Sequence, residues 1–400
     1  MKNLFIYSPI GQYLIVTGNY WAFTLTDGAL RMLVVLYFHQ LGYSPLELAM
    51  LFLLYEFFGV VTNLVGGWLG ARIGLNKTMN IGLALQVGAL CMLLVPTSML
   101  SVAYVMAAQA LSGIAKDLNK MSAKSAIKTL LPADAQGKLY RWVAMLTGSK
   151  NALKGCGFFL GGVLLTVFGF AGAVAAMAGF LALVWCLSLV LLKAELGKAK
   201  HKVKFTQLFA KESRINYLSA ARLFLFGARD IWFVVALPVF MATQLNWPHE
   251  SIGAFMAVWI IGYGLIQTQA PKITQWRGES LSDSDKARWW VTALLFVPTV
   301  IAGLLSLQWQ IEWVLVGGLL LFGAVFAVNS SLHSYMIVDY AKADGVSVDV
   351  GFYYMANAAG RLLGTVLSGA LYQWYGLEAC LIGSSVFLLI AVLFTRRLPE

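Results

Sequence analysis

The chain has 400 residues, of which 60% are hydrophobic and only 12% are charged, and its formal net charge is +11. A soluble domain carries about 25% charged residues, so the composition excludes an ordinary soluble protein and indicates a membrane protein with many crossings. The positive charge is explained by basic cytoplasmic loops and by contact with anionic lipid. We therefore expect membrane lipids as partners, and no nucleic acid.

The apolar residues form twelve segments, each long enough to cross the ~30 Å hydrocarbon layer as a helix of about 20 residues. The sequence therefore predicts an all-α integral membrane protein with twelve transmembrane helices. In chain order, the predicted spans lie near residues 14–38, 46–70, 78–96, 99–117, 141–168, 172–192, 215–242, 251–270, 289–306, 312–335, 349–373 and 378–395.

Lys and Arg residues are confined to one set of alternating loops and to a few positions inside the spans. Of the 29 basic residues, 23 lie on that set of loops and six lie inside spans. Basic loops stay in the cytoplasm during membrane insertion, so both termini are expected to be cytoplasmic. The loops that contain no Lys or Arg, and that are expected outside, are 39–46, 96–101, 169–172, 243–250, 306–312 and 373–378.

The longest connection, residues 193–214, is polar and rich in Lys, and it divides the spans six and six. We predict an N-terminal half at 1–192, a basic cytoplasmic linker at 193–214 and a C-terminal half at 215–400. The halves look like repeats, because an offset of 207 places Lys154 on Arg361. The glycine pairs that match at the same offset are Gly157 with Gly364, Gly162 with Gly369, and Gly169 with Gly376.

Two six-helix halves joined by a basic loop resemble the parallel repeat of the major facilitator transporters, which bind substrate between the halves near the membrane midplane. Residues 66–74 (GGWLGARIG) are similar to the G-x-L-x-D-R-x-G pattern of that superfamily, with Ala71 in place of Asp. Residues 157–162 (GFFLGG) are close to the G-P-x-x-G-G of antiporters, with Phe158 in place of Pro, and Gln109 stands where Arg is frequent. These motifs support the fold more strongly than a mode of transport.

Nine charged residues lie inside the predicted spans, where a charge at mid-helix costs at least ~2.5–3.5 kcal/mol. One interpretation is pairing that holds helices together, because Asp27 and Arg31 lie four residues apart on one helical face and could pair locally. The basic residues inside the spans are Arg31, Lys150, Lys154, Arg222, Arg229 and Arg361, and the acidic ones are Asp27, Glu56 and Asp230.

The excess of basic over acidic residues favours a second interpretation. Unpaired buried cations are costly unless an anion reaches them. Lys150 and Lys154 have no acid on their helix, and Arg361 has Asn357 one turn away instead of an acid. Arg presents a fork of donors suited to carboxylate or phosphate, and Lys supplies a compact charge. We therefore predict a central cavity in which the six basic residues and Asn357 bind a small polyanion.

The three acidic residues inside the spans, Asp27, Glu56 and Asp230, are candidates for proton coupling. A carboxylate beside excess cations can take up a proton when the substrate neutralises those cations. Glu56 stands alone on its helix and is the hardest of the three to explain as part of a local pair.

Four lysines recur every four residues from Lys116 to Lys128, with Lys120 and Lys124 between them. This spacing favours a cytoplasmic, lipid-facing stripe on one side of a helix. The alternative is a cytoplasmic mouth that attracts anions.

Neither metal nor cofactor chemistry is predicted. The chain has no CxxC motif, and its four histidines are scattered. A membrane enzyme would typically carry a buried His paired with Asp or Asn, so we expect a transporter and not an enzyme. Isolated cysteines in apolar segments are expected to be small hydrophobic side chains; they are Cys91, Cys156, Cys186 and Cys380.

Long stretches of the chain resemble the ArsJ-type organoarsenical efflux permeases. The resemblance covers most of the chain and implies a bacterial inner-membrane exporter of 1-arseno-3-phosphoglycerate. This unstable ester forms when glyceraldehyde-3-phosphate dehydrogenase uses arsenate in place of phosphate, so the resemblance implies that enzyme as a functional partner. Export would give arsenate resistance. The stretches are 17–31 (TGNYWAFTLTDGALR), 55–64 (YEFFGVVTNL), 112–120, 147–155 and 221–230.

The residue chemistry is compatible with this substrate without identifying it. The implied ester is a hard oxyanion at both ends, which suits an excess of buried cations. Its arsenic is pentavalent, so no cluster of thiols is required. An antiporter for another phosphorylated or anionic metabolite therefore stays open as the alternative.

Overall fold

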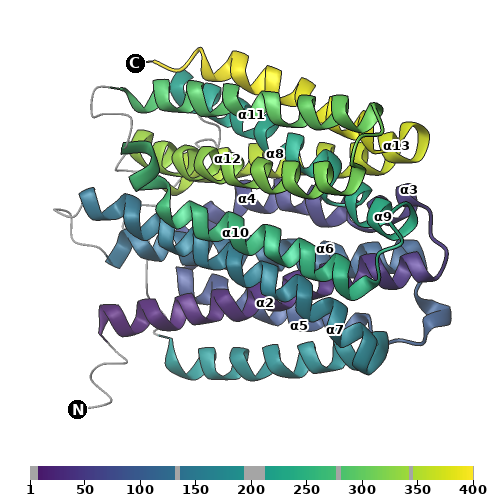
Figure 1. Ribbon diagram of the computed structural model, residues 1–400. Helices are drawn as coiled ribbons and strands as arrows, with labels where there is room; N and C mark the ends of the chain where they lie inside the picture. Colours follow the sequence, from purple (N-terminus) through teal and green to yellow (C-terminus); the bar gives the residue numbers. More distant parts are fainter. Residues whose placement is uncertain (1–7, 131–135, 193–211, 276–280, 342–345, 400) are drawn as a thin grey trace.

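The computed structural model describes residues 8–130, 136–192, 212–275, 281–341 and 346–399. These residues form a bundle of long helices that lie side by side, with α2 beginning and α13 ending at the same end of the bundle (Figure 1). In chain order, the helices are α2 (Pro9–Gln40), α3 (Pro45–Leu51), α4 (Leu53–Ile73), α5 (Leu75–Met92), the short 3-10 helix η1 (Thr97–Met99), α6 (Val102–Leu130), α7 (Gln136–Leu191), α8 (Ser213–Phe233), α9 (Ala236–Thr243), α10 (His249–Gln275), α11 (Asp283–Ser306), α12 (Ile311–Tyr340) and α13 (Val346–Thr395).

Eight helical stretches in the described part of the chain are long and apolar enough to cross a membrane. Two of them, Met145–Leu191 and Asp349–Thr395, each contain two predicted spans on either side of a kink. The third and fourth predicted spans lie in α5 and α6, outside those eight stretches. All twelve predicted spans therefore lie in helices, and the protein is an all-α, multi-pass membrane protein.

The two kinks fall on a glycine pair that matches between the halves. Gly169 in α7 has φ 66° and Gly376 in α13 has φ 80°. A side chain is strained at such angles, whereas glycine adopts them readily. The offset of 207 found in the sequence thus places the same turn at the same point of each half.

Two predicted spans are interrupted. The span predicted at 46–70 consists of α3 and α4, and the span predicted at 215–242 consists of α8 and α9. At the second break, Ser368 Oγ of α13 accepts hydrogen bonds from the backbone N–H groups of Val235 at 3.3 Å and Ala236 at 3.1 Å. A neighbouring helix thus satisfies donors that the break frees.

The fourth span is longer than predicted. The sequence predicts its end near residue 117, where lysines begin, but α6 continues to Leu130. Lysine is a good helix former, so a run of well-spaced lysines need not end a helix. Lys120 and Lys124 consequently belong to the same rigid helix as Lys116.

Equivalent helix pairs pack together in the two halves. The first and fifth spans pack as α2 on α7, and the seventh and eleventh spans pack as α8 on α13. A Cβ on Gly157 would lie 2.4 Å from the carbonyl oxygen of Leu25, and one on Gly364 would lie 2.6 Å from that of Gly227. Glycine therefore permits the same close helix crossing in each half.

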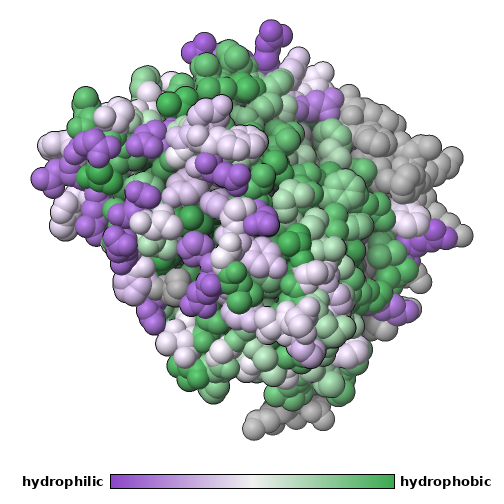
Figure 2. Space-filling model, turned by 90° about the vertical axis from the view of Figure 1, so that its right-hand side faces the viewer, coloured by the Kyte–Doolittle hydropathy of each residue, from purple (hydrophilic) through white to green (hydrophobic). Residues whose placement is uncertain are grey.

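The halves meet through two further pairs, α7 with α10 and α4 with α13. Apolar side chains also cross between them: Met32 and Leu36 of α2 belong to the apolar core of the second half. Seen from the end that carries the kinks, polar side chains gather over part of the face and apolar ones cover much of the rest (Figure 2). Residues 193–211 of the predicted linker lie outside the described residues, so the domain boundary stays a prediction.

Candidate functional site

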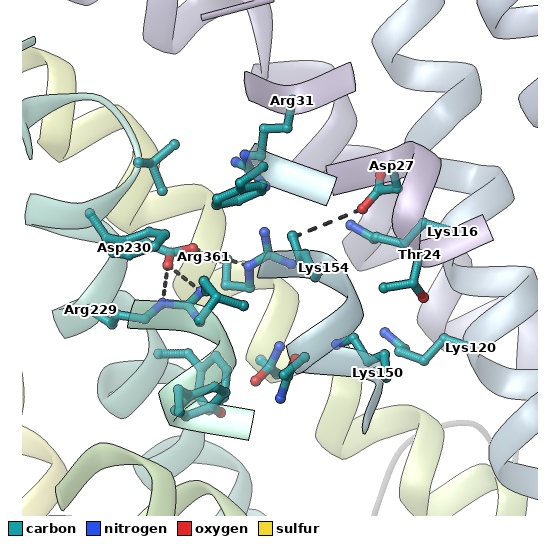
Figure 3. Close-up of a pocket in the computed structure, with 18 of the residues that line it drawn as sticks. Thr24, Asp27, Arg31, Lys116, Lys120, Lys150, Lys154, Arg229, Asp230 and Arg361 are labelled. Atoms are coloured by element: carbon teal, nitrogen blue, oxygen red, sulfur yellow. Dashed lines mark hydrogen bonds and ion pairs between the residues drawn. The ribbon is translucent and has the colours of Figure 1, made fainter. Parts of the chain in front are cut away.

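A cavity lies between the two halves, lined by α2, α6 and α7 on one side and by α8 to α10, α12 and α13 on the other (Figure 3). Its volume of about 110 Å³ is well below the ~300–1,000 Å³ of pockets for drug-sized ligands, so it suits a small molecule. Its acidic lining residues are Asp27 and Asp230. Its basic lining residues are Arg31, Lys116, Lys120, Lys124, Lys150, Lys154, Arg222, Arg229 and Arg361.

The structure brings together every residue that the sequence predicts to bind substrate. The six basic residues inside the spans and Asn357 all line the cavity. Asp27 and Asp230, two of the three predicted coupling residues, line it as well. Glu56 lies outside the lining and is fully buried, with 0% of its surface exposed. Their roles in binding and coupling remain predictions.

The interpretation of Lys116, Lys120 and Lys124 as a lipid-facing stripe is wrong, because all three line the cavity. Their spacing places them on one face of α6 but cannot say what that face meets. Lys116 lies against Tyr55 and Glu56 of α4, whereas Lys120 and Lys124 turn toward Tyr354 in the second half. There Lys124 donates a hydrogen bond to the Tyr354 hydroxyl of α13 and lies 3.9 Å from its ring centre. The side chain of Lys128 lies outside the described residues.

Glu56, in the first turn of α4, is surrounded by basic groups from three other helices. Its Oε1 accepts hydrogen bonds from Arg31 of α2 at 3.2 Å and from Arg361 of α13 at 2.6 Å. Lys116 Nζ of α6 lies 4.0 Å from Oε2. A carboxylate with no exposed surface needs such partners, because an unpaired buried charge is strongly destabilising. Glu56 therefore links helices of both halves.

Asp27 and Arg31 share a face of α2 but do not pair with each other, which corrects the local pairing that their spacing suggests. Asp27 accepts a hydrogen bond from the Tyr55 hydroxyl at 2.6 Å and lies 3.9 Å from Lys154 Nζ. Arg31 reaches Glu56 instead. A four-residue spacing decides the partner on an isolated helix, whereas here a fully buried carboxylate on the next helix competes for the guanidinium.

Asp230 is the acidic centre of the second half. It accepts hydrogen bonds from Nε of the neighbouring Arg229 at 2.6 Å and from Nε of Arg361 at 3.1 Å (Figure 3). A second nitrogen of the Arg361 guanidinium donates to Glu56. Arg361 therefore bridges one carboxylate of each half. The matched residues Lys154 and Arg361 thus each contact the acid on the helix that they pack against.

Three basic residues of the lining have no carboxylate partner in the described part of the chain: Arg222, Lys150 and Lys124. Arg222 donates hydrogen bonds to Asn357 Oδ1 at 2.9 Å and to the Ser330 carbonyl at 3.0 Å, which are neutral acceptors. Lys124 contacts a tyrosine hydroxyl. Lys150 has neither a hydrogen bond nor an ion pair among the described residues. These charges are uncompensated, so an anion would be strongly attracted to them.

The neutral part of the lining adds hydrogen-bonding groups and apolar surface. Thr24, Asn151 and Tyr263 supply hydroxyl and amide groups, and the described residues of the lining include no Cys or His. Phe158 of α7 and Phe233 of α8 lie ring to ring across the halves, 6.4 Å apart. The cavity can therefore hold hard oxygen anions by charge and hydrogen bonds, and it offers no thiolate ligand to a soft metal or metalloid.

Comparison with known proteins gives the family and the fold. A sequence model of the Major Facilitator Superfamily matches residues 16–279 and 218–400. No curated protein sequence matches the chain significantly. A bacterial homologue of the iron transporter ferroportin in an outward-facing state has a TM-score of 0.72 and 13% identity, covering 96% of this chain and 98% of that chain. The human organic anion transporter MFSD10 (TETRAN) has a TM-score of 0.69 and 16% identity, covering 96% and 97%.

Proposed function

The chain belongs to the Major Facilitator Superfamily and is a membrane transporter, and we propose that it exports a small organic polyanion. The observation that carries this proposal is the charge of the cavity. Nine basic side chains line it against two acidic ones, and two further carboxylates, Glu56 and Asp117, reach it through ion pairs. In a poorly solvated site, such an excess needs an anionic ligand to offset it.

The proteins of similar fold are described as transporters of different kinds of substrate. The residues that line the cavity of this chain agree better with one kind than with the other. One protein is described as an organic anion transporter and another as a homologue of an iron transporter. A cavity lined by nine basic residues repels a metal cation, and no group of His, Cys, Asp and Glu that could hold a metal occurs among the described residues. An organic anion agrees with the charge.

For the substrate itself, we propose the arsenylated three-carbon ester 1-arseno-3-phosphoglycerate. The support is the resemblance to the ArsJ-type permeases together with where the resembling stretches lie. Those stretches contain most of the charged residues that line the cavity: Asp27, Arg31, Lys116, Lys120, Lys150, Lys154, Arg222, Arg229 and Asp230. The partner implied by this substrate is glyceraldehyde-3-phosphate dehydrogenase, which would form it.

Proton coupling forms part of the same proposal. Glu56 and Asp230 both accept hydrogen bonds from the positively charged Arg361. An oxyanion that takes over Arg361 removes that charge from the two carboxylates, so a proton can bind in its place. Asp27, beside Lys154, would respond in the same way to an anion bound by that lysine.

We propose that the protein lies in a bacterial inner membrane with both termini in the cytoplasm. The alternating distribution of Lys and Arg supports this orientation. A membrane-impermeant thiol reagent applied to intact cells should label cysteines placed at Asn246 or Gln308 and should miss one placed at Lys286. Labelling at Lys286 from outside would reverse the orientation.

Resistance measurements test the proposed substrate. Expression in an arsenic-sensitive bacterium should protect against arsenate and not against arsenite, and only when the dehydrogenase and its triose-phosphate substrate are present. The reason is that the cavity recognises oxyanions by charge and has no thiols for trivalent arsenic. Protection against arsenite, or arsenate protection that persists without the dehydrogenase, would refute the assignment.

A transporter for another phosphorylated metabolite is the alternative. One observation favours it: among the described residues, the lining holds Arg, Lys, amide, hydroxyl and apolar groups besides two acids, and none of these distinguishes arsenate from phosphate. Everted membrane vesicles supplied with the dehydrogenase, NAD⁺ as its oxidant, triose phosphate and arsenate would accumulate the arsenylated product. An excess of stable three-carbon phosphates that abolishes this uptake, and is itself carried faster, would favour the alternative.

A further inference from the structure

We propose that the cavity binds its substrate through two chemically different subsites, so that the substrate is a short molecule with an oxyanion at each end. This inference rests on the proposed anion transport and adds which residues would bind each end of the anion. We define the free subsite as Lys124, Lys150 and Arg222, and the paired subsite as Lys116, Arg31, Lys154, Arg229 and Arg361. The ninth basic residue of the lining, Lys120, pairs with Asp117 on its own helix and is assigned to neither subsite.

The free subsite can bind an anion without displacing a carboxylate. Its three cations have no carboxylate partner among the described residues, and Arg222 is held by neutral acceptors that leave its charge uncompensated. The Phe226 ring lies 3.8 Å from the Arg222 guanidinium carbon and fixes its position from one side. A bound oxyanion would supply the counter-charge that these poorly solvated cations lack. This subsite should therefore bind even a ligand with a single charged end.

The paired subsite binds an anion only in competition with carboxylates. Glu56 accepts from Arg31 and Arg361, and Asp230 accepts from Arg229 and Arg361. An entering oxyanion gains these donors only if a carboxylate gives them up. A ligand with one charged end should therefore bind more weakly to this subsite than to the free subsite. A ligand already anchored in the free subsite reaches it as an intramolecular step, at high effective concentration.

The spacing of the subsites is set by helix geometry. On α7, Lys150 precedes Lys154 by four residues, or about 6 Å of helix rise. On α8, Arg222 precedes Arg229 by seven residues, or about 10 Å. On α13, Asn357, which holds Arg222, precedes Arg361 by about 6 Å.

These helices run toward the same, kinked end of the bundle (Figure 1). In the cavity, Lys150 lies on the opposite side of Lys154 and Arg361 from Arg31 (Figure 3). A separation of about 6–10 Å matches a chain of about three carbons with an oxyanion at each end.

Two stable probes separate the subsites. Propane-1,3-bisphosphonate has two charged ends and propylphosphonate has one, and calorimetry on the purified full-length protein measures the affinity of each. The two-ended probe should bind at least about tenfold more tightly than the one-ended probe. Lys150→Gln should weaken both probes by about tenfold or more, because both use the free subsite.

Variants of the paired subsite should affect only one probe. Lys154→Gln should weaken the two-ended probe by about tenfold or more and leave the one-ended probe unchanged. Lys116→Gln, whose ion-pair contacts are long at 3.9 and 4.0 Å, provides a second variant that disturbs the fold little. Lys77→Gln, at an exposed position of α5 outside the lining, is the matched control and should change neither affinity.

The outcomes distinguish this inference from the proposed function. If both probes bind equally tightly, or if Lys154→Gln weakens both to the same extent, the cavity has one undivided site and the inference is overturned while anion transport stands. If neither probe binds the unmodified protein, the anion proposal itself is wrong, and the two subsites are wrong with it.

Discussion

Each half pairs a base at a matching position with an acid on the helix packed against it, yet the two pairs are built differently. In the first half, Lys154 Nζ lies 3.9 Å from Asp27. In the second half, Arg361 donates to Asp230 at 3.1 Å and also to Glu56 of the first half at 2.6 Å. Lysine offers a point charge, whereas arginine offers a fork of donors. A change of one basic residue type thus converts a contact within a half into a bridge between halves.

One turn earlier, the halves differ again. With the same offset of 207, Lys150 corresponds to Asn357. Lys150 adds an unpartnered charge to the cavity, whereas Asn357 adds none and instead accepts a hydrogen bond from Arg222. The backbone repeat is therefore symmetric while the charges on it are not, and the substrate must be unsymmetrical or must bind in one orientation.

Removing the matched bases gives the largest expected effects. Lys154→Ala and Arg361→Ala should each abolish transport, because loss of a charged contact in a dry site costs about 2–5 kcal/mol. Arg361→Ala should also lower the free energy of unfolding by about 3–5 kcal/mol, since it leaves two buried carboxylates without their bridge. Lys154→Ala should destabilise less, because Asp27 keeps the Tyr55 hydroxyl.

Transport in proteoliposomes and denaturation in detergent measure the two effects, with Lys77→Ala as the exposed control. Equal loss of stability in both variants would show that Arg361 does not act as a bridge. Full transport by either variant would remove that residue from the binding site.

Glu56 tests whether the bridge between halves also couples transport to protons. Glu56→Gln keeps an oxygen for Arg31 and Arg361 but cannot exchange a proton in the physiological range. We expect net efflux driven by a pH gradient to fall about tenfold or more, while exchange of substrate across the membrane continues. Both rates are measurable in one proteoliposome preparation. If they fall together, Glu56 has a structural or binding role, and Asp27 or Asp230 becomes the coupling candidate.

The shared backbone can be tested at the matched glycines. Gly157→Ala and Gly364→Ala should each destabilise the protein by about 1–3 kcal/mol, because the new Cβ would lie 2.4 Å or 2.6 Å from a backbone oxygen of the adjoining helix. Gly18→Ala and Gly179→Ala, where nothing lies within 4 Å, are the controls and should change stability by less than about 1 kcal/mol. Clearly unequal effects in the two halves would argue that the crossings are not equivalent.

The fold could be predicted from the sequence because its signals are local and repeated. Apolar segment length fixes the spans, and the glycine pair at 169 and 376 fixes the turns. Most charged residues of the cavity could be predicted because a charge inside a membrane span is energetically costly and is retained only where it has a function or a partner. For Lys116, Lys120 and Lys124 the sequence favours a lipid-facing stripe instead, because they lie at or beyond the predicted end of their span, where a charge costs little.

Which partner each charge takes could not be predicted. Arg31 lies only four residues from Asp27 on its own helix, but it pairs with Glu56 on another helix. That choice depends on helix packing and on which carboxylate would otherwise be buried without a partner. Neither quantity is encoded in the spacing of one helix.

The smallest effects on stability and resistance are expected when the cysteines are replaced. The cysteines also differ between the halves in number and burial. Cys91, Cys156 and Cys186 of the first half are exposed on the protein surface, and Cys380 of the second half is buried. None of them lines the cavity. Replacing the three exposed cysteines by Ala should change stability by no more than about 0.5 kcal/mol. Cys380→Ala should cost about 1 kcal/mol through lost packing.

All four replacements together should leave arsenate resistance intact, because recognition depends on Arg and Lys and not on thiols. Resistance assays on the variant without cysteines, normalised to its amount in the membrane, measure this. A loss of resistance at normal abundance would mean that a thiol meets the substrate during transport. Arsenic would then be recognised in its soft, trivalent form, and the oxyanion chemistry assigned to both ends of the cavity would have to be abandoned.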